Sequence, residues 1–334
     1  MNREIIFKSR PVGMVSRDNF EIKEVSGSYE LHDGEVLVRA LYISVDPYMR
    51  GRMSDSKSYI PPFETGKPLE GGVVAEVVES KSGALSKGEV VLGNLPWKEE
   101  QVVRADKLNK VDANIAPASY YLGILGMPGL TAYLGLTRIG APKSGETVVI
   151  SGAAGAVGSV VGQIAKIMGC HVVGIAGSEE KANFLKNELG FDAVINYKTA
   201  GDLSKAVAEC CPNGVDVYYD NVGGEVSDAV LLHINRFARI ILCGQISLYN
   251  STEMPMGPRP QVALVKNSAL MKGFIVNDYN EYYPEAIKQL AEWIKEGKLL
   301  YHETVLQGFD KLPEAFIGLF EGRNTGKLLV KVSK

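Results

Sequence analysis

Short apolar runs, most of them opened by glycine, dominate the first third of the chain. Three examples are GEVLVRALYISV, GGVVAEVVE and GEVVLGN, which are rich in valine and lie between turn residues. Runs of this kind, bounded by turn signals, are typical of β-strands. We therefore predict a mostly β domain, a barrel or a roll, over about residues 1–120.

A different rhythm begins at about Glu146, where apolar strand patterns alternate with helical patterns. The predicted strands are ETVVIS, HVVGIA, DAVINY, VDVYYD and ARIILCG, and the helical segments between them are AVGSVVGQIAKIMG, SEEKANFLKNELG, DLSKAVAEC and EVSDAVLLHIN. Regular alternation of strand and helix predicts a parallel, doubly wound sheet with right-handed crossovers. The run ALMKGFIV (residues 269–276) could add a sixth strand, and YYPEAIKQLAEWIKEG predicts a further helix.

The end of the chain returns to the turn-rich β pattern, so we expect this tail to fold back onto the first domain. The expected α/β protein has a β domain over residues 1–122, completed by 299–334, and a doubly wound domain over 123–298. Residues 113–137 carry no charge. Pro117, Pro128 and several glycines make this stretch too broken for a membrane-spanning helix, and we interpret it as a buried segment at the domain junction.

Composition narrows the possible functions. The 334 residues are 46% hydrophobic and 22% charged, with a net charge of −3 and no long basic run, which argues against a nucleic-acid partner. The first residues, MNREIIFKSR, lack the apolar core of a signal peptide. The four cysteines have no paired spacing. We therefore expect no structural disulfide, and we predict a location in the reducing cytoplasm.

A glycine-rich turn follows the first predicted strand of the second domain. Residues 153–158 read Ala-Ala-Gly-Ala-Val-Gly, which fits the G-x-G-x-x-G pattern with alanine in the first place. Gly155 would let the backbone approach a pyrophosphate at the N-terminus of the helix starting near Ala156, and Gly158 would let that helix pack close to the strand. The motif is weak alone. Because it stands between a predicted strand and a predicted helix, it favours dinucleotide binding over a plain tight turn.

The end of the second predicted strand distinguishes between two cofactors. NAD sites usually place Asp or Glu there to bind the ribose 2′-hydroxyl, whereas this strand runs into Gly177-Ser178 with Lys181 close behind. Small residues leave room for a 2′-phosphate, and the lysine supplies a positive charge for it. Ser178 also suits a helix N-cap whose dipole Glu179 and Glu180 complement, and Glu179 could instead reach a hydroxyl. The pattern favours NADP(H).

The order of the domains resembles the medium-chain dehydrogenase/reductase superfamily. This resemblance implies a GroES-like β-barrel catalytic domain together with a Rossmann domain. Many members bind a catalytic zinc through cysteine and a His-Glu pair. Here PLEGG has Leu69 in the place of the histidine and retains Glu70, and no cysteine precedes Cys170. Since zinc needs three or four converging ligands, we predict no metal site.

Within the superfamily, segments from residue 45 onwards are similar to one zinc-free group. These segments are VDPYMRGRM, GMPGLTAY, GAAGAVGSVVGQIAK, GSEEK, NYKT, YDNVGG, CGQISLYN and GRNTGKLLVKV. In combination they resemble the prostaglandin reductases, the alkenal double-bond reductases and bacterial curcumin reductase. The resemblance implies a homodimer that uses NADPH to reduce the C=C bond of α,β-unsaturated ketones and aldehydes. The expected partner is a small enone or enal, not a nucleic acid or a membrane.

The resemblance also implies where the cofactor binds. It assigns the diphosphate to Gly155, Ala156, Val157 and Gly158, the 2′-phosphate to Lys181 and Tyr197, and other contacts to Asn221, Cys243, Gly244, Gln245, Ile246, Ser247, Leu248, Tyr249, Phe274, Ile275, Val276 and Asn324. Asn324 would close over the cofactor from the other domain, and Met127 and Thr131 would face the nicotinamide.

Some of these residues have a second interpretation from the sequence itself. Tyr197 could be an aromatic residue packing on the surface at a strand end, and residues 274–276 would be core strand even without a ligand. We interpret Cys243 as a packing residue, not a nucleophile, because no histidine or lysine lies near it in the sequence.

Without a metal, hydrogen bonds must polarise the substrate carbonyl as an enolate develops. Hydride from the nicotinamide would reach the β carbon, and a proton would then reach the α carbon. Tyr249 and Tyr48 are the candidate donors, because a phenol with a pKa of about 10 can donate a hydrogen bond while water completes the protonation. Two alternatives stay open: a quinone oxidoreductase of the same fold and a non-catalytic NADPH-binding protein.

Overall fold

Over the described residues, most strands pair into two large sheets, one in each of two units, and the first two strands form a separate two-stranded sheet. The computed structural model describes residues 2–26 and 28–332. The first unit holds the chain up to Leu122, Glu303–Asn324 and the chain from Leu328, and the second holds Gly123–His302 and Thr325–Lys327. Within the described ranges, no helix is both long enough and apolar enough to cross a membrane.

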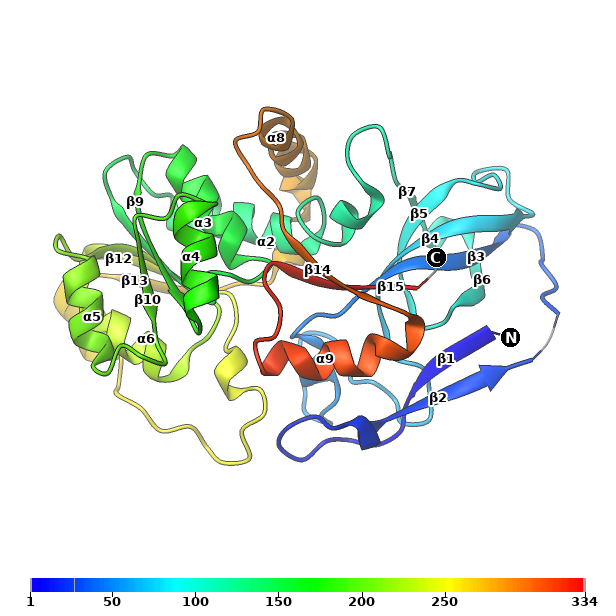
Figure 1. Ribbon diagram of the computed structural model, residues 1–334, viewed down its shortest axis with the longest axis horizontal. Coiled ribbons are helices and arrows are strands. Elements are labelled where there is room, and N and C mark those ends of the chain that lie inside the picture. The colour runs from blue at the N-terminus through cyan, green and yellow to red at the C-terminus, as the bar shows by residue number, and fades with distance from the viewer. Residues whose placement is uncertain (1, 27, 333–334) are drawn as a thin grey trace. The chain divides into compact units, whose positions relative to one another are not determined.

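The first unit consists mainly of antiparallel strands (Figure 1). Its strands are β1 (Asn2–Phe7), β2 (Phe20–Val25), β3 (Glu35–Ser44), β4 (Glu70–Ser80), β5 (Val90–Pro96), β6 (Glu100–Arg104), β7 (Asn109–Lys110), β14 (Glu303–Gln307) and β15 (Lys327–Lys331), and its helices are α1 (Met49–Arg52) and α9 (Leu312–Phe320). One edge of β3 pairs with β4, and the other edge pairs with β6 and then with β15. β3 is therefore the central strand of this sheet.

The core of the first unit draws on both ends of the chain. Phe7 of β1 and Trp97 are fully buried in one cluster with Phe316 of α9. The rings of Trp97 and Phe316 meet edge to face with centroids 6.5 Å apart, a favoured arrangement for aromatic pairs. The C-terminal segment is thus part of this core.

The second unit contains a six-stranded sheet in which all neighbouring strands are parallel. Its strands are β8 (Thr147–Ser151), β9 (His171–Ala176), β10 (Ala193–Asn196), β11 (Val215–Asp220), β12 (Ile234–Leu242) and β13 (Leu270–Gly273), in the order β10-β9-β8-β11-β12-β13. The chain winds outward from β8 on one side and from β11 on the other. The predicted doubly wound sheet is confirmed, with its topological switch point between β8 and β11.

Over the described residues, the second unit has five α-helices that the sequence predicts, in the expected order, and two that it does not predict, at residues 127–134 and 261–267. They are α2 (Met127–Leu134), α3 (Gly158–Ile167), α4 (Glu179–Asn187), α5 (Leu203–Cys210), α6 (Gly224–Leu231), α7 (Gln261–Asn267) and α8 (Tyr283–Lys295). Figure 1 shows α3 and α4 next to each other, and both contact β9. Tyr218 and Tyr219 of β11 are fully buried, and as successive strand residues they point to opposite faces of the sheet.

Some element boundaries differ from the prediction, two of them in strands β12 and β13. β12 begins at Ile234, earlier than the run ARIILCG, and a register shift against β11 accommodates extra residues that include Phe237 with a positive φ of 64°. The predicted strand at residues 269–276 is wrong in its second half, because β13 ends at Gly273. Phe274 and Ile275 lie outside the strand, and Val276 begins a 3-10 helix, η6 (Val276–Tyr282).

The uncharged segment is buried only in part. Residues 113–115 are exposed, whereas residues 122–136 are buried except for Met127, which is 38% exposed. The division between the two units falls inside this segment, after Leu122.

Candidate functional site

The glycine-rich turn joins β8 to α3 beside the switch point. The N–H of Gly155 donates to the Gly152 carbonyl (3.0 Å), and the N–H of Ser159 donates to the Gly155 carbonyl (3.1 Å). A Cβ atom on Gly158 would lie 2.4 Å from the Gly152 oxygen and 2.8 Å from Ala153 Cα. Because both are backbone atoms, only glycine lets α3 start this close to β8. This close approach is the geometry of a dinucleotide-binding turn.

The N-terminus of α3 has no side-chain cap of its own. The helix begins at Gly158, later than the predicted start near Ala156, and its N-cap residue, Val157, makes no side-chain hydrogen bond. Ser178 caps α4 and Asp202 caps α5, whereas α2, α6, α7, α8 and α9 resemble α3 in having no side-chain cap. An N-terminus without such a cap leaves the positive end of the helix dipole for an anion, so the turn fits a diphosphate.

The buried carboxylate of Asp220 ties together the loops at the switch point. Its Oδ1 accepts hydrogen bonds from the hydroxyl of Ser151 (2.7 Å), the hydroxyl of Tyr218 (2.9 Å) and the N–H of Gly223 (2.9 Å). Its Oδ2 accepts from the side chain of Gln245 (3.1 Å). Asp220 therefore holds the ends of β8 and β11 and the loop after β12. The sequence analysis did not select Asp220, although a carboxylate ending an apolar strand was visible in VDVYYD.

Asn221 and the segment 243–249 lie together beside this carboxylate. The side chain of Asn221 donates to the Ser151 carbonyl (2.8 Å), and its own carbonyl accepts from Ile246 N–H (3.2 Å). The hydroxyl of Ser247 donates to the Val222 carbonyl (2.6 Å). Residues 243–249, which include the 3-10 helix η5 (Ile246–Leu248), therefore lie along the segment that follows β11.

The hydroxyl of Tyr249 points back to its own loop. It accepts a hydrogen bond from the N–H of Gln245 (3.3 Å) and would be 3.1 Å from a Cβ atom on Gly244. Burial raises the pKa of Tyr249 above its ordinary value. The phenol is therefore neutral at physiological pH. Because the hydroxyl is the acceptor in its contact with the N–H of Gln245, its own proton does not take part in that hydrogen bond.

The segments that follow β9 and β10 bring a tyrosine and two lysines near one another. The Tyr197 ring lies against Gly177, where a Cβ atom would be 2.9 Å from the ring. The side chain of Lys198 lies 6.0 Å from the centre of the same ring. Burial, and next the positive charge of Lys198, lower the pKa of Lys181 from its ordinary value. Tyr197 is 43% exposed, so its ring lies at the surface with the two lysines, and the carboxylate of Glu180 also acts on Lys181.

Lys198 was missed by the sequence analysis, although it follows Tyr197 in NYKT. The expected capping role of Ser178 is confirmed, since its hydroxyl accepts from the N–H of Lys181 (3.2 Å). The carboxylate of Glu179 is held by a hydrogen bond, because its Oε1 accepts from the side chain of Asn196 (2.8 Å). In this position it is not directed at a ribose hydroxyl beside the end of β9.

Tyr48 lies in the first unit, immediately before α1, and is packed against the core. Burial, and next the negative charge of Asp46, raise the pKa of Tyr48 well above its ordinary value. Nearby, Arg52 donates to Glu70 (2.6 Å), and its guanidinium carbon lies 4.0 Å from the centre of the Phe63 ring. The retained glutamate is thus paired with an arginine.

The other predicted contacts are spread over the second unit. Thr131 donates to the Met127 carbonyl (2.7 Å) and accepts at its own carbonyl from Tyr219 (2.7 Å). The Phe274 ring lies against Gly135, in the π-helical turn η4 (Gly135–Gly140) that continues α2.

Asn324 belongs to the first unit. Two residues further on, Gly326 N–H donates to the Ala154 carbonyl in the glycine-rich turn (2.8 Å). The chain that follows Asn324 therefore runs directly to the candidate diphosphate turn.

Two further observations concern the Cys243 thiol and possible metal ligands among the described residues. Burial raises the pKa of Cys243 to about 12, so the thiol is protonated at neutral pH. Leu69, in the place of a zinc-binding histidine, is fully buried. Over residues 2–26 and 28–332, no three His, Cys, Asp or Glu side chains are grouped to hold a metal ion.

A parallel sheet with a glycine-rich turn at its switch point, joined to an antiparallel β unit, defines a dinucleotide-dependent dehydrogenase or reductase. Comparison with known proteins specifies the family. Residues 3–111 match the family described as N-terminal domain of oxidoreductase, and residues 156–294 match the family described as zinc-binding dehydrogenase. The chain belongs to the medium-chain dehydrogenase/reductase superfamily, within the group of its relatives below.

Relatives align with nearly the whole chain. YfmJ of Bacillus subtilis, whose name describes an NADP-dependent oxidoreductase, is 58% identical over 99% of this chain and 98% of its own. The NADPH-dependent curcumin reductase of Escherichia coli is 43% identical over 99% of this chain and 97% of its own. The NADP⁺-dependent 2-alkenal reductase of Nicotiana tabacum is also 43% identical, over 100% and 98%.

A solved structure gives the same result in three dimensions. CurA from Vibrio vulnificus in complex with NADPH has a TM-score of 0.94 at 44% identity, covering 99% of both chains. The predicted family and the predicted two-domain α/β fold are thereby confirmed.

Proposed function

We propose that this protein is an NADPH-dependent reductase of the C=C bond of α,β-unsaturated ketones and aldehydes. The observation that carries the proposal is the near-complete match to CurA in complex with NADPH, at a TM-score of 0.94. Relatives of similar identity are named for the reduction of curcumin and of 2-alkenals. Both names refer to conjugated carbonyl compounds, so the substrate class is an enone or an enal.

The residues of the second unit fit NADPH in two ways. The close approach at Gly158 and the uncapped start of α3 suit the diphosphate. The lysines at positions 181 and 198 and the ring of Tyr197 suit the 2′-phosphate of the adenosine ribose. Asn221 and residues 243–249, which contact Asp220 or the segment after it, would hold the nicotinamide end, together with backbone groups of 274–276. Asn324, from the first unit, is a further proposed contact.

When bound, NADPH supplies the hydride that the β carbon of the substrate receives. We assign Tyr249 as the donor that stabilises the oxygen of the developing enolate. Its hydroxyl accepts from Gln245 N–H, which leaves its proton for the substrate and strengthens the phenol as a donor. Its raised pKa keeps that proton in place at neutral pH. Water then completes protonation of the α carbon.

Tyr48 is the second candidate donor. Burial keeps this phenol neutral as well, so it can donate a hydrogen bond but is a weak acid. We assign it to shaping and orienting the substrate, with the Arg52–Glu70 pair as a rigid support at 2.6 Å.

A substrate panel tests the proposed function. NADPH oxidation should be measured with enones, enals, quinones and saturated aldehydes, with identification of the organic product. We expect turnover of enones and enals to the saturated carbonyl compound. Turnover of quinones alone would favour a quinone oxidoreductase. Tight NADPH binding without turnover of any acceptor would favour a non-catalytic binding protein.

We further propose a homodimer in the cytoplasm. The four cysteines are all free thiols, which suits a reducing compartment.

Strand β13 ends the parallel sheet, and apolar side chains near it are exposed: Val262 (74%), Val265 (80%) and Leu270 (51%). Exposed apolar side chains of α7 and β13, together with the open edge of β13, are suited to packing against a second copy. Light scattering should give the mass of a dimer, and Val265→Glu should give a monomer.

A further inference from the structure

The amide of Asn196 is held by two hydrogen bonds at the cofactor end of the sheet. Asn196 is the last residue of β10 and lies opposite Ala176, the last residue of β9. Its Oδ1 accepts from the N–H of Lys198 (3.2 Å), and its Nδ2 donates to Oε1 of Glu179 (2.8 Å). The first bond fixes the direction of the amide, so its donor side faces the carboxylate.

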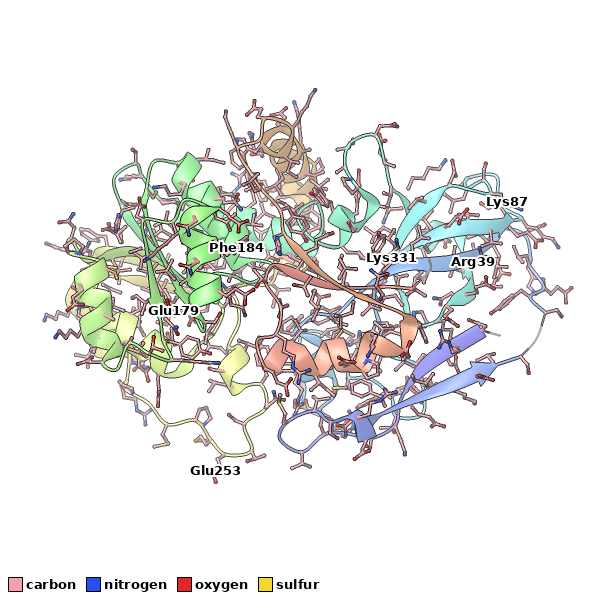
Figure 2. The ribbon with its side chains drawn as sticks, viewed as in Figure 1. Arg39, Lys87, Glu179, Phe184, Glu253 and Lys331 are labelled. Atoms are coloured by element: carbon pink, nitrogen blue, oxygen red, sulfur yellow. The ribbon has the colours of Figure 1, made fainter. Side chains whose placement is uncertain are left out.

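The carboxylate that Asn196 holds is the one most able to change the cofactor preference. Glu179 is the first acidic residue after β9, and Figure 2 shows it at the start of α4. A carboxylate at the end of the second strand binds the 2′-hydroxyl of NAD. The same charge repels a 2′-phosphate and competes for the ammonium groups of Lys181 and Lys198.

We propose that Asn196 is a positioning residue for cofactor selectivity. By holding Glu179, it keeps this carboxylate away from the ribose, which disfavours NADH and lets the two lysines act on the 2′-phosphate. The proposal rests on the cofactor site assigned above. The amide itself is not a ligand, because it acts through the carboxylate.

A double-mutant cycle on binding tests this role. The Kd values of NADPH and NADH should be measured by calorimetry for wild type, Asn196→Ala, Glu179→Gln and the double variant. We expect Asn196→Ala to reduce the NADPH preference by about three- to five-fold, the size of one exposed charge interaction. In the double variant the preference should return to within about two-fold of wild type, because the free carboxylate is gone.

A control variant tests whether the change in cofactor preference is specific to Asn196, and a second variant at position 196 is used if the first does not fold. Asn187→Ala, at the other end of α4, removes an exposed asparagine and should leave both Kd values unchanged. If Asn196→Ala does not fold, Asn196→Asp retains the acceptor for Lys198 N–H and repels Glu179. Its loss of preference should again be larger with Glu179 present than with Glu179→Gln.

Two results would overturn the inference: an unchanged preference in Asn196→Ala, or an equal loss with and without Glu179. The proposed function fails separately. Its failure would appear in the wild-type protein, as weak NADPH binding or as no turnover of enones, whatever the cycle shows.

Discussion

At the residue scale, the cofactor assignment depends most on one ammonium group. Lys181→Ala should raise the KM for NADPH about ten- to a hundred-fold, since a hydrogen bond to a charged group contributes roughly 1.5–3 kcal/mol. The KM for NADH, which lacks the 2′-phosphate, should change little. Steady-state kinetics with both cofactors measures the difference. Lys186→Ala, exposed on the same helix, is the matched control, and equal losses with both cofactors would remove Lys181 from the phosphate site.

We expect the chemical step of the proposed reaction to depend most on the phenol of Tyr249 in the second unit. Tyr249→Phe should lower kcat about ten-fold or more with little change in NADPH affinity, because the lost hydrogen bond strengthens only in the transition state. Tyr48→Phe should mainly raise the KM for the enone. Tyr283→Phe, which loses a hydroxyl bonded to Asn277, should leave both constants near wild type. A wild-type kcat in Tyr249→Phe, with a raised KM for NADPH, would make Tyr249 a cofactor-packing residue.

At the element scale, the junction of β8 and α3 requires glycine at position 158. Gly158→Ala places a methyl group 2.4 Å from a backbone oxygen, so α3 must move away from β8. We expect a loss of about 1–3 kcal/mol in the free energy of unfolding and a raised KM for NADPH. Thermal melting and kinetics measure both. Gly83→Ala adds its methyl group where no atom lies within 4 Å and should be neutral; a neutral Gly158→Ala would contradict the close packing.

Sequence patterns predicted the bounds of an element best where a single, mostly apolar run forms the whole strand. HVVGIA and VDVYYD coincide with β9 and β11, because buried parallel strands are apolar on both faces. The same reasoning failed for Phe274–Val276. That run is apolar because the Phe274 ring packs on Gly135, not because it continues the sheet. The start of β12 was missed because its first half, INRF, contains polar residues and a bulge.

At the scale of the whole molecule, long-range contacts that no local pattern contains assemble the candidate site. Asp220 accepts from Ser151, which is 69 residues away in the sequence, and from Gln245, which is 25 residues away. Likewise, Asn196 and Glu179 meet only because β10 lies beside β9. Motifs suggested the glycine turn and Lys181. Asp220 and Lys198 also stand in sequence patterns, VDVYYD and NYKT, but the contacts from which we propose roles for them and for Asn196 form only when the strands lie together.

Transfer of hydride from NADPH to the β carbon of a conjugated C=C bond is the step that distinguishes the proposed reductase from its alternatives. The most direct measurement uses a simple acyclic enone and NADPH deuterated at the transferred position of C4, with NMR of the product. We expect the saturated ketone, with one deuterium at its β carbon and one NADP⁺ formed per ketone. An allylic alcohol carrying deuterium at the former carbonyl carbon, or NADPH oxidation without a saturated product, would contradict it.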